Sequence, residues 1–180
     1  MPDGALQGIT VIELGHMVSA PYCGKLFADY GADVIKIEPP DGDIARRWGP
    51  FPGDQPHPEK SGLFFFLNTN KRGVTLDVTR AAGRDVLLQL LRRADVLVEN
   101  NRPREMRAWG LDYASLSQVN PDLVMISITP YGQTGPYSDW TGYDLNAFHL
   151  SAAGHRYCGR PGEPPLEHGT FAADFYGAVT

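Results

Sequence analysis

The feature that most constrains the fold is an alternation of short apolar runs with segments of helical periodicity. Five runs are typical of buried β-strands, and they span residues 10–14, 33–38, 73–77, 94–99 and 123–128. Strands that are apolar throughout and separated by helices are typical of a parallel sheet covered on both faces. Because crossovers between parallel strands are right-handed, we predict an α/β fold, namely a doubly wound, Rossmann-like parallel sheet with helices on both faces.

The first helix is expected to begin at Ser19. Ser19-Ala20-Pro21 places a capping residue before a proline, which the first turn of a helix tolerates. Tyr22, Leu26 and Tyr30 recur every four residues along this helix, which predicts that they share a face. Gly31 follows, where the chain needs a left-handed residue before the next strand.

Two further segments complete the path of the chain. Residues 41–61 contain four prolines and are expected to form a long irregular loop. Residues 80–93 have helical periodicity, and the buried face that this periodicity predicts consists of Val86, Leu87, Leu90 and Leu91.

The predicted fold makes four loops candidate binding sites. In an open parallel sheet, ligands bind beyond the carboxyl ends of the strands, which here places binding groups at residues 15–19, 39–47, 100–104 and 130–144. The first loop lies at a strand-to-helix turn, where backbone N–H groups can meet a phosphate. The sequence contains neither G-x-G-x-x-G nor G-x-x-x-x-G-K-[ST], so no motif supports binding of a dinucleotide or a nucleoside triphosphate.

Composition and charge exclude several classes of protein. The chain has 180 residues with 16 basic and 21 acidic side chains, and the basic ones are scattered, which disfavours a nucleic-acid partner. There is neither a long apolar run nor a secretory leader, so we expect a cytoplasmic protein with no membrane partner. Cys23 and Cys158 have no C-x-x-C or His partner at ligand spacing, so we expect reduced thiols and no metal site.

One carboxylate has an unusual setting. Asp174 stands between Ala172-Ala173 and Phe175-Tyr176, in a segment expected to begin an apolar helix. Desolvation there would raise the pKa of Asp174 and increase its nucleophilicity. The alternative is that Asp174 simply caps this last helix. No G-x-S-x-G elbow is present, and none of the five histidines is paired with a serine or cysteine in a recognisable motif.

Six ordered blocks extend these observations to a family. The blocks are Leu6-x-Gly8-Ile9-x-Val11-Ile12-Glu13-Leu14, Leu26-x-Ala28-Asp29-x-Gly31-Ala32-Asp33-Val34-Ile35-Lys36-Ile37-Glu38, Gly42-Asp43, Asn70-Lys71-Arg72-Gly73-Val74-Thr75-Leu76-Asp77, Ala94-Asp95-Val96-Leu97-Val98-Glu99-Asn100 and Tyr131-Gly132-Gln133-Thr134-Gly135-Pro136, with Pro21 between the first two. Together they closely resemble the class III CoA-transferase family (CaiB/BaiF type), which includes formyl-CoA transferase, carnitine CoA-transferase and α-methylacyl-CoA racemase.

The resemblance implies a transferase that moves CoA from an acyl-CoA to a carboxylic acid. Asp174 stands at the position of the catalytic aspartate of the family, which forms a mixed anhydride and then an aspartyl-CoA thioester. CoA and acyl-CoA are then substrates, and no permanently bound cofactor and no metal are expected. The family also implies an interlocked homodimer. Residues 1–180 would be the N-terminal, CoA-binding part of the large domain, without the small domain and the C-terminal return, and inactive alone.

Matching position by position, the resemblance implies a set of CoA contacts. They are Val18, Ser19, Leu76, Thr79, Asn100, Asn101, Arg102 and Tyr143. The sequence departs from the family where Asn101 replaces an aromatic residue and where Ala108 replaces an arginine.

Two alternatives to the transferase remain. The first is an α-methylacyl-CoA racemase, which uses a histidine of a Gly-His-Asp segment as a base. Here the segment is Gly142-Tyr143-Asp144, and a phenol of pKa about 10 is a poor base at neutral pH. The second is a truncated, non-catalytic module that binds CoA.

Overall fold

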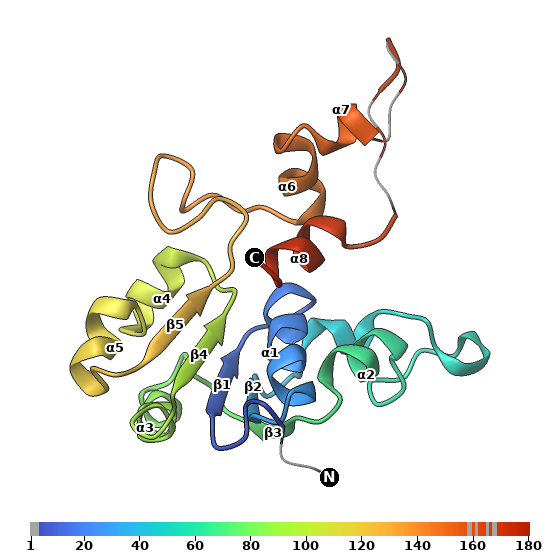
Figure 1. The fold of residues 1–180 in the computed structure, drawn as a ribbon. Helices are drawn as coiled ribbons and strands as arrows, with labels where there is room; N and C mark the ends of the chain where they lie inside the picture. Colours follow the sequence, from blue (N-terminus) through green and yellow to red (C-terminus); the bar gives the residue numbers. More distant parts are fainter. Residues whose placement is uncertain (1–3, 158–159, 161, 165, 167–168) are drawn as a thin grey trace.

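A five-stranded parallel sheet forms the centre of the protein, in a computed structural model that describes residues 4–157, 160, 162–164, 166 and 169–180. Its order is β3-β2-β1-β4-β5 (Figure 1). The strands are β1 (Thr10–Leu14), β2 (Asp33–Glu38), β3 (Arg72–Thr75), β4 (Val96–Glu99) and β5 (Val124–Ser127). The chain winds outward from β1 in one direction to β3 and then, beginning again at β4, in the other direction to β5. The predicted doubly wound fold is confirmed.

Helices cover both faces of this sheet. Along the chain they are α1 (Ser19–Asp29), α2 (Gly62–Asn68), α3 (Ala81–Leu91), α4 (Pro103–Trp109), α5 (Tyr113–Val119), α6 (Asp144–Leu150), α7 (Ala153–Tyr157) and α8 (Ala172–Gly177). Two 3-10 helices, η1 (Ile44–Arg47) and η2 (Pro52–Asp54), lie in the segment predicted to be a long loop.

The core consists of two apolar layers separated by the sheet. Ile12 of β1 and Leu97 of β4 pack in one layer with residues of α3, α4 and α5. Val11 and Val98 of the same strands pack in the other layer with α1. Neighbouring residues of a strand point to opposite faces, so strands that are apolar at every position require cover on both sides.

The buried face of α1 differs from the prediction. Tyr22 and Leu26 are half-buried and Tyr30 is exposed, whereas small residues form the buried stripe, namely Ala20, Cys23, Gly24 and Ala28. The reason lies at Gly24, where an added Cβ would stand 2.2 Å from Glu13 Oε2. The helix therefore approaches the sheet too closely for large side chains.

Other local expectations are partly confirmed. Leu87 and Leu91 of α3 are fully buried, but Val86 is 43% exposed because it faces away from the sheet. β5 is an edge strand and leaves Val124 exposed, although its sequence is the most apolar of the five. Gly31 has the expected positive φ, at +102°.

Of the two cysteines, Cys23 lies within the described residues. Cys23 is free and buried, and burial raises the pKa of its thiol to about 11. Cys158 lies outside the described residues. No helix in the described ranges is long and apolar enough to cross a membrane.

Candidate active site

The candidate site begins where the sheet changes direction, between β1 and β4. The Asn100 side chain, directly after β4, joins the two loops that diverge there. Its Nδ2 donates to the His16 carbonyl at 2.8 Å and to Ser19 Oγ at 3.0 Å, and its Oδ1 accepts from the His16 N–H at 3.0 Å. Asn101 Nδ2 donates to the Leu14 carbonyl at 2.8 Å. The structure thus brings the expected residues Ser19, Asn100 and Asn101 together at the carboxyl ends of β1 and β4.

A groove of about 270 Å³ opens beside these residues, across the carboxyl ends of β1, β2 and β3. We call it the strand-end groove. Three of the expected CoA contacts line it, namely Leu76, Thr79 and Asn101. Its remaining walls are Leu14, Gly15, His16, Ile37, Pro39, Gly42, Asp43, Ile44, Asp77, Val78 and Trp109. The walls are mainly apolar, with a few polar groups, as in sites for small organic ligands.

The other expected contacts lie outside the walls of this groove. Val18 is fully buried and Ser19 is 5% exposed, so their side chains support the first turn of α1. The Arg102 guanidinium donates to Thr141 Oγ1 at 2.8 Å and also pairs with Glu105. Tyr143 is exposed and directly precedes α6. Arg102 and Tyr143 therefore belong to the side of the site formed by residues 130–144.

Asp174 lies in the first turn of α8 and is half-buried. Its backbone N–H donates to Asp144 Oδ1 at 2.8 Å. Burial raises the pKa of the Asp174 carboxyl from 3.8 to about 6, and the charge of Asp144 adds to the shift. The alternative that Asp174 caps the helix is wrong, because Phe171 occupies the N-cap and Asp174 lies in the first turn, where its own N–H is bound by Asp144.

Two aromatic contacts hold α8 next to the groove side of the sheet. The Phe175 ring meets Tyr22 of α1 edge to face, at 4.8 Å between centroids. The Phe171 ring meets Trp48, at the end of η1, at 5.4 Å. Figure 1 shows α6, α7 and α8 grouped beyond the sheet, with α8 next to the start of α1. The helix that carries Asp174 therefore packs against α1.

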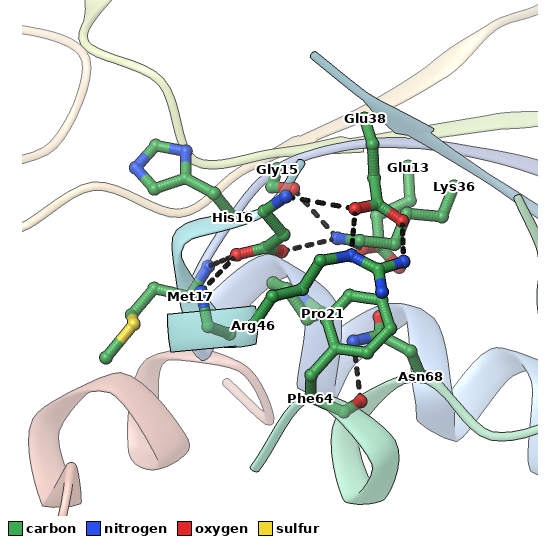
Figure 2. A network of polar contacts seen from close by, with 12 residues as sticks. Glu13, Gly15, His16, Met17, Pro21, Lys36, Glu38, Arg46, Phe64 and Asn68 are labelled. Atoms are coloured by element: carbon green, nitrogen blue, oxygen red, sulfur yellow. Dashed lines mark hydrogen bonds and ion pairs between the residues drawn. The ribbon is translucent and has the colours of Figure 1, made fainter. Parts of the chain in front are cut away.

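Sequence analysis missed a network of buried charges under the site (Figure 2). Glu13 and Lys36 face each other in the register of β1 and β2, and Lys36 Nζ lies 2.8 Å from Glu13 Oε1 and 2.8 Å from Asp43 Oδ2. Lys71 Nζ lies 2.7 Å from Glu13 Oε2. A signal was available, since Glu13 and Lys36 are the charged residues that interrupt two otherwise apolar runs.

Two further residues of the site were also missed. His16 lines the groove, and burial lowers its pKa although Asp43 opposes the shift. Asp144 is buried, and its Oδ2 has no hydrogen-bond partner among the described residues. Its position directly after Tyr143 was the available signal. In the same ranges no group of three or more His, Cys, Asp or Glu side chains could hold a metal ion.

Known proteins match nearly the whole chain. The profile of CoA-transferase family III matches residues 6–180. The succinate–glutarate CoA-transferase of Agrobacterium fabrum is 38% identical over 97% of this chain and 44% of its own length. The acetyl-CoA:oxalate CoA-transferase of Acetobacter aceti is 37% identical over 99% of this chain and 45% of its own length.

A solved structure agrees with these matches. A CAIB/BAIF family protein from Brucella suis superposes with a TM-score of 0.86 and 34% identity, over 98% of this chain and 48% of that one. The chain thus spans less than half the length of the relatives that it matches. Profile, sequence identity and fold agree, and this chain belongs to the class III CoA-transferase family.

Proposed function

We propose that the protein is an acyl-CoA:carboxylate CoA-transferase, with Asp174 as its nucleophile and residues 1–180 as its CoA-binding domain. The observation that carries this proposal is the setting of Asp174, a half-buried carboxylate whose pKa is raised to about 6. At pH 7 such a group is still about ten parts ionised to one protonated. It is more basic than an ordinary aspartate, which favours attack on a thioester.

The proposed reaction proceeds through two kinds of covalent intermediate on Asp174. The Asp174 carboxylate attacks the thioester carbonyl of the donor, and the C–S bond breaks to give a mixed anhydride and CoA thiolate. The thiolate then attacks the carbonyl carbon of Asp174, which forms an aspartyl-CoA thioester and releases the donor acid. The acceptor carboxylate attacks the carbonyl carbon of this thioester, and the C–S bond breaks to give a second mixed anhydride and CoA thiolate. The thiolate then attacks the acceptor carbonyl carbon of that anhydride, which forms the new acyl-CoA and breaks the C–O bond to Asp174. Asp174 is regenerated as a carboxylate.

CoA is proposed to enter along the strand-end groove. The apolar walls around Leu76 suit the adenine ring, and the Asn101 and Thr79 side chains supply hydrogen-bonding groups. Arg102 would exchange its bond to Thr141 for a phosphate oxygen. The pantetheine arm would then pass Val18, Ser19 and Asn100 toward Tyr143 and Asp174. We also propose that the protein acts as a cytoplasmic homodimer on an acyl-CoA and a carboxylic acid, with no permanently bound cofactor.

Trapping of the acyl-enzyme tests the proposal. The protein that contains this chain would be incubated with succinyl-CoA or acetyl-CoA and with glutarate or oxalate, because the names of two relatives contain succinate, glutarate, acetyl-CoA and oxalate. Hydroxylamine would quench the reaction, and peptide mass spectrometry would search for a hydroxamate on Asp174. We expect the hydroxamate in the wild type and its absence, with loss of transfer but not of CoA binding, in Asp174→Ala.

Two results would contradict the proposal. Full transfer activity in Asp174→Ala would exclude this residue as the nucleophile. Deuterium exchange at the α-carbon of the acyl group, without any hydroxamate, would instead assign the protein to the racemase branch. CoA binding with neither signal would leave a non-catalytic binding module.

A further inference from the structure

Four charged side chains form a buried cluster, and one of them, Asp43, is part of the wall of the strand-end groove. Glu13, Lys36, Asp43 and Lys71 each keep at most 2% of their side-chain surface exposed. Lys36 contacts both carboxylates, and Lys71 contacts Glu13 and also donates to the Pro21 carbonyl at 2.6 Å. Two positive and two negative charges compensate each other within the cluster. It therefore needs no anion or cation from a ligand.

Such a network is not explained by stability alone. Taking charges out of water costs several kcal/mol per ion, and well-packed apolar residues often replace a buried ion pair without loss of stability. These side chains also bind backbone groups, and those contacts indicate what the network does.

The Lys36–Asp43 pair holds two loop segments that are distant in the sequence. Lys36 Nζ donates to the Gly15 carbonyl at 3.0 Å. Asp43 Oδ1 accepts from the Met17 N–H at 3.0 Å and from the Ala45 N–H at 2.8 Å. One ion pair thus joins the turn between β1 and α1 to the start of η1.

The turn that it holds is strained. Met17 has a φ of +63°, in the left-handed region that residues other than glycine rarely adopt. Such a conformation persists only when surrounding contacts impose it, and these positions cluster at functional sites. Here the Asp43 carboxylate binds the N–H of Met17 itself.

Both held segments are walls of the strand-end groove. Gly15 and His16 form one wall, and Gly42, Asp43 and Ile44 form part of another. We propose that Lys36 and Asp43 are positioning residues that fix these two walls in the conformation that accepts CoA, so that the groove is organised before the substrate arrives. This inference rests on the proposed CoA site, and it adds the residues that shape it.

A double substitution separates positioning from stability. Lys36→Met and Asp43→Leu each leave the buried cluster with one uncompensated charge, so both single variants should unfold at lower temperature than the wild type. The double variant Lys36→Met/Asp43→Leu removes both charges and should recover most of that loss. Because the Met17 N–H and the Gly15 carbonyl are then released, the dissociation constant for CoA should rise about tenfold or more in the double variant.

The matched control is another ion pair of the same strand. Arg72 Nε and Nη2 donate to the Asp33 carboxylate at the opposite, amino-terminal end of β2, far from the groove walls. The double variant Asp33→Leu/Arg72→Met should bind CoA as the wild type does. Asp43→Asn provides a milder variant that keeps an oxygen acceptor, and its affinity should fall between those of the wild type and Asp43→Leu.

The double substitution should change KM more than kcat. We expect the KM for acyl-CoA to rise about tenfold in the double variant, with a much smaller change in kcat. A folded double variant with wild-type affinity, or a fall in kcat with an unchanged KM, would overturn the inference. If the double variant does not fold, equal CoA affinity of Asp43→Asn and wild type, together with equal KM, would overturn it instead. Wild-type protein that fails to bind CoA would refute the proposed function itself, which distinguishes the two failures.

Discussion

Replacement of the proposed nucleophile should stabilise the folded protein. The fold raises the pKa of Asp174 from 3.8 to about 6, so it penalises the ionised carboxylate. At about 1.4 kcal/mol per pH unit, this corresponds to about 3 kcal/mol at most. Asp174 keeps part of its surface in water, which screens the penalty, so we expect Asp174→Asn to gain about 1–3 kcal/mol at pH 8. Asparagine has the same shape, and the hydrogen bond to Asp144 comes from the backbone N–H and is retained.

The pH dependence fixes the sign of this effect. Between pH 3.8 and about 6 the folded state binds more protons at Asp174 than the unfolded state does, so this group lowers stability as the pH rises. Below pH 3.8 the carboxyl is protonated in both states and contributes no penalty. The advantage of Asp174→Asn should therefore be complete above pH 7 and vanish near pH 4.

Urea unfolding of both proteins at pH 4, 6 and 8 measures this difference. Asp139→Asn is a suitable control, because Asp139 is half exposed and pairs with Arg107 on the surface. That change should shift stability by less than about 1 kcal/mol at every pH. A variant Asp174→Asn that is no more stable than wild type at pH 8, or whose advantage does not grow with pH, would refute the assigned burial and charge repulsion at this site.

Two further substitutions test the packing that supports the site. Leu97→Ala should lower the free energy of unfolding by about 2–5 kcal/mol in urea titration, because the Leu97 side chain is fully buried in a core layer of the sheet. A loss below about 1 kcal/mol would contradict that placement. Gly24→Ala should lower the free energy of unfolding by about 1–3 kcal/mol, because its Cβ would stand 2.2 Å from Glu13 Oε2. Gly73→Ala is the control, because its Cβ would have no neighbour within 4 Å and stability should change little. Equal thermal unfolding of the two variants would exclude the close approach of α1.

The fold was predictable because its signal is local and repeated. β1 and β2 are short apolar runs followed by turn residues, and the helices between parallel strands favour right-handed crossovers, which make a doubly wound sheet the expected topology. The helix α2 was not predicted. Its sequence is apolar around its whole circumference, and Phe65 and Phe66 are exposed while only Leu67 is buried, so no periodic face was present to detect.

The site was predictable only where one residue carries the signal. Asp174 was singled out as an acid within an apolar segment, and the structure shows it half-buried, whereas its role as nucleophile came from the family resemblance and stays a prediction. The Glu13–Lys36 pair was not found, because it depends on the register between two strands, which is a tertiary property. Arg102 is a different case, since its pairing with Glu105 three residues later follows from helix geometry and could have been anticipated.

The expected separation of KM and kcat follows from how α8 is attached. The helix that carries Asp174 is held by the Asp144 carboxylate, by the Tyr22 ring and by the Trp48 ring, and Ala178 at its end packs in the core layer of α1. Only Trp48 belongs to the segment that Asp43 fixes, because it directly follows η1, whose N-cap is Asp43. Loss of the Lys36–Asp43 pair therefore releases two groove walls, whereas among these supports of the nucleophile it affects the Trp48 contact. Binding of CoA should suffer more than the chemistry at Asp174, and this ordering is what the kinetic comparison would measure.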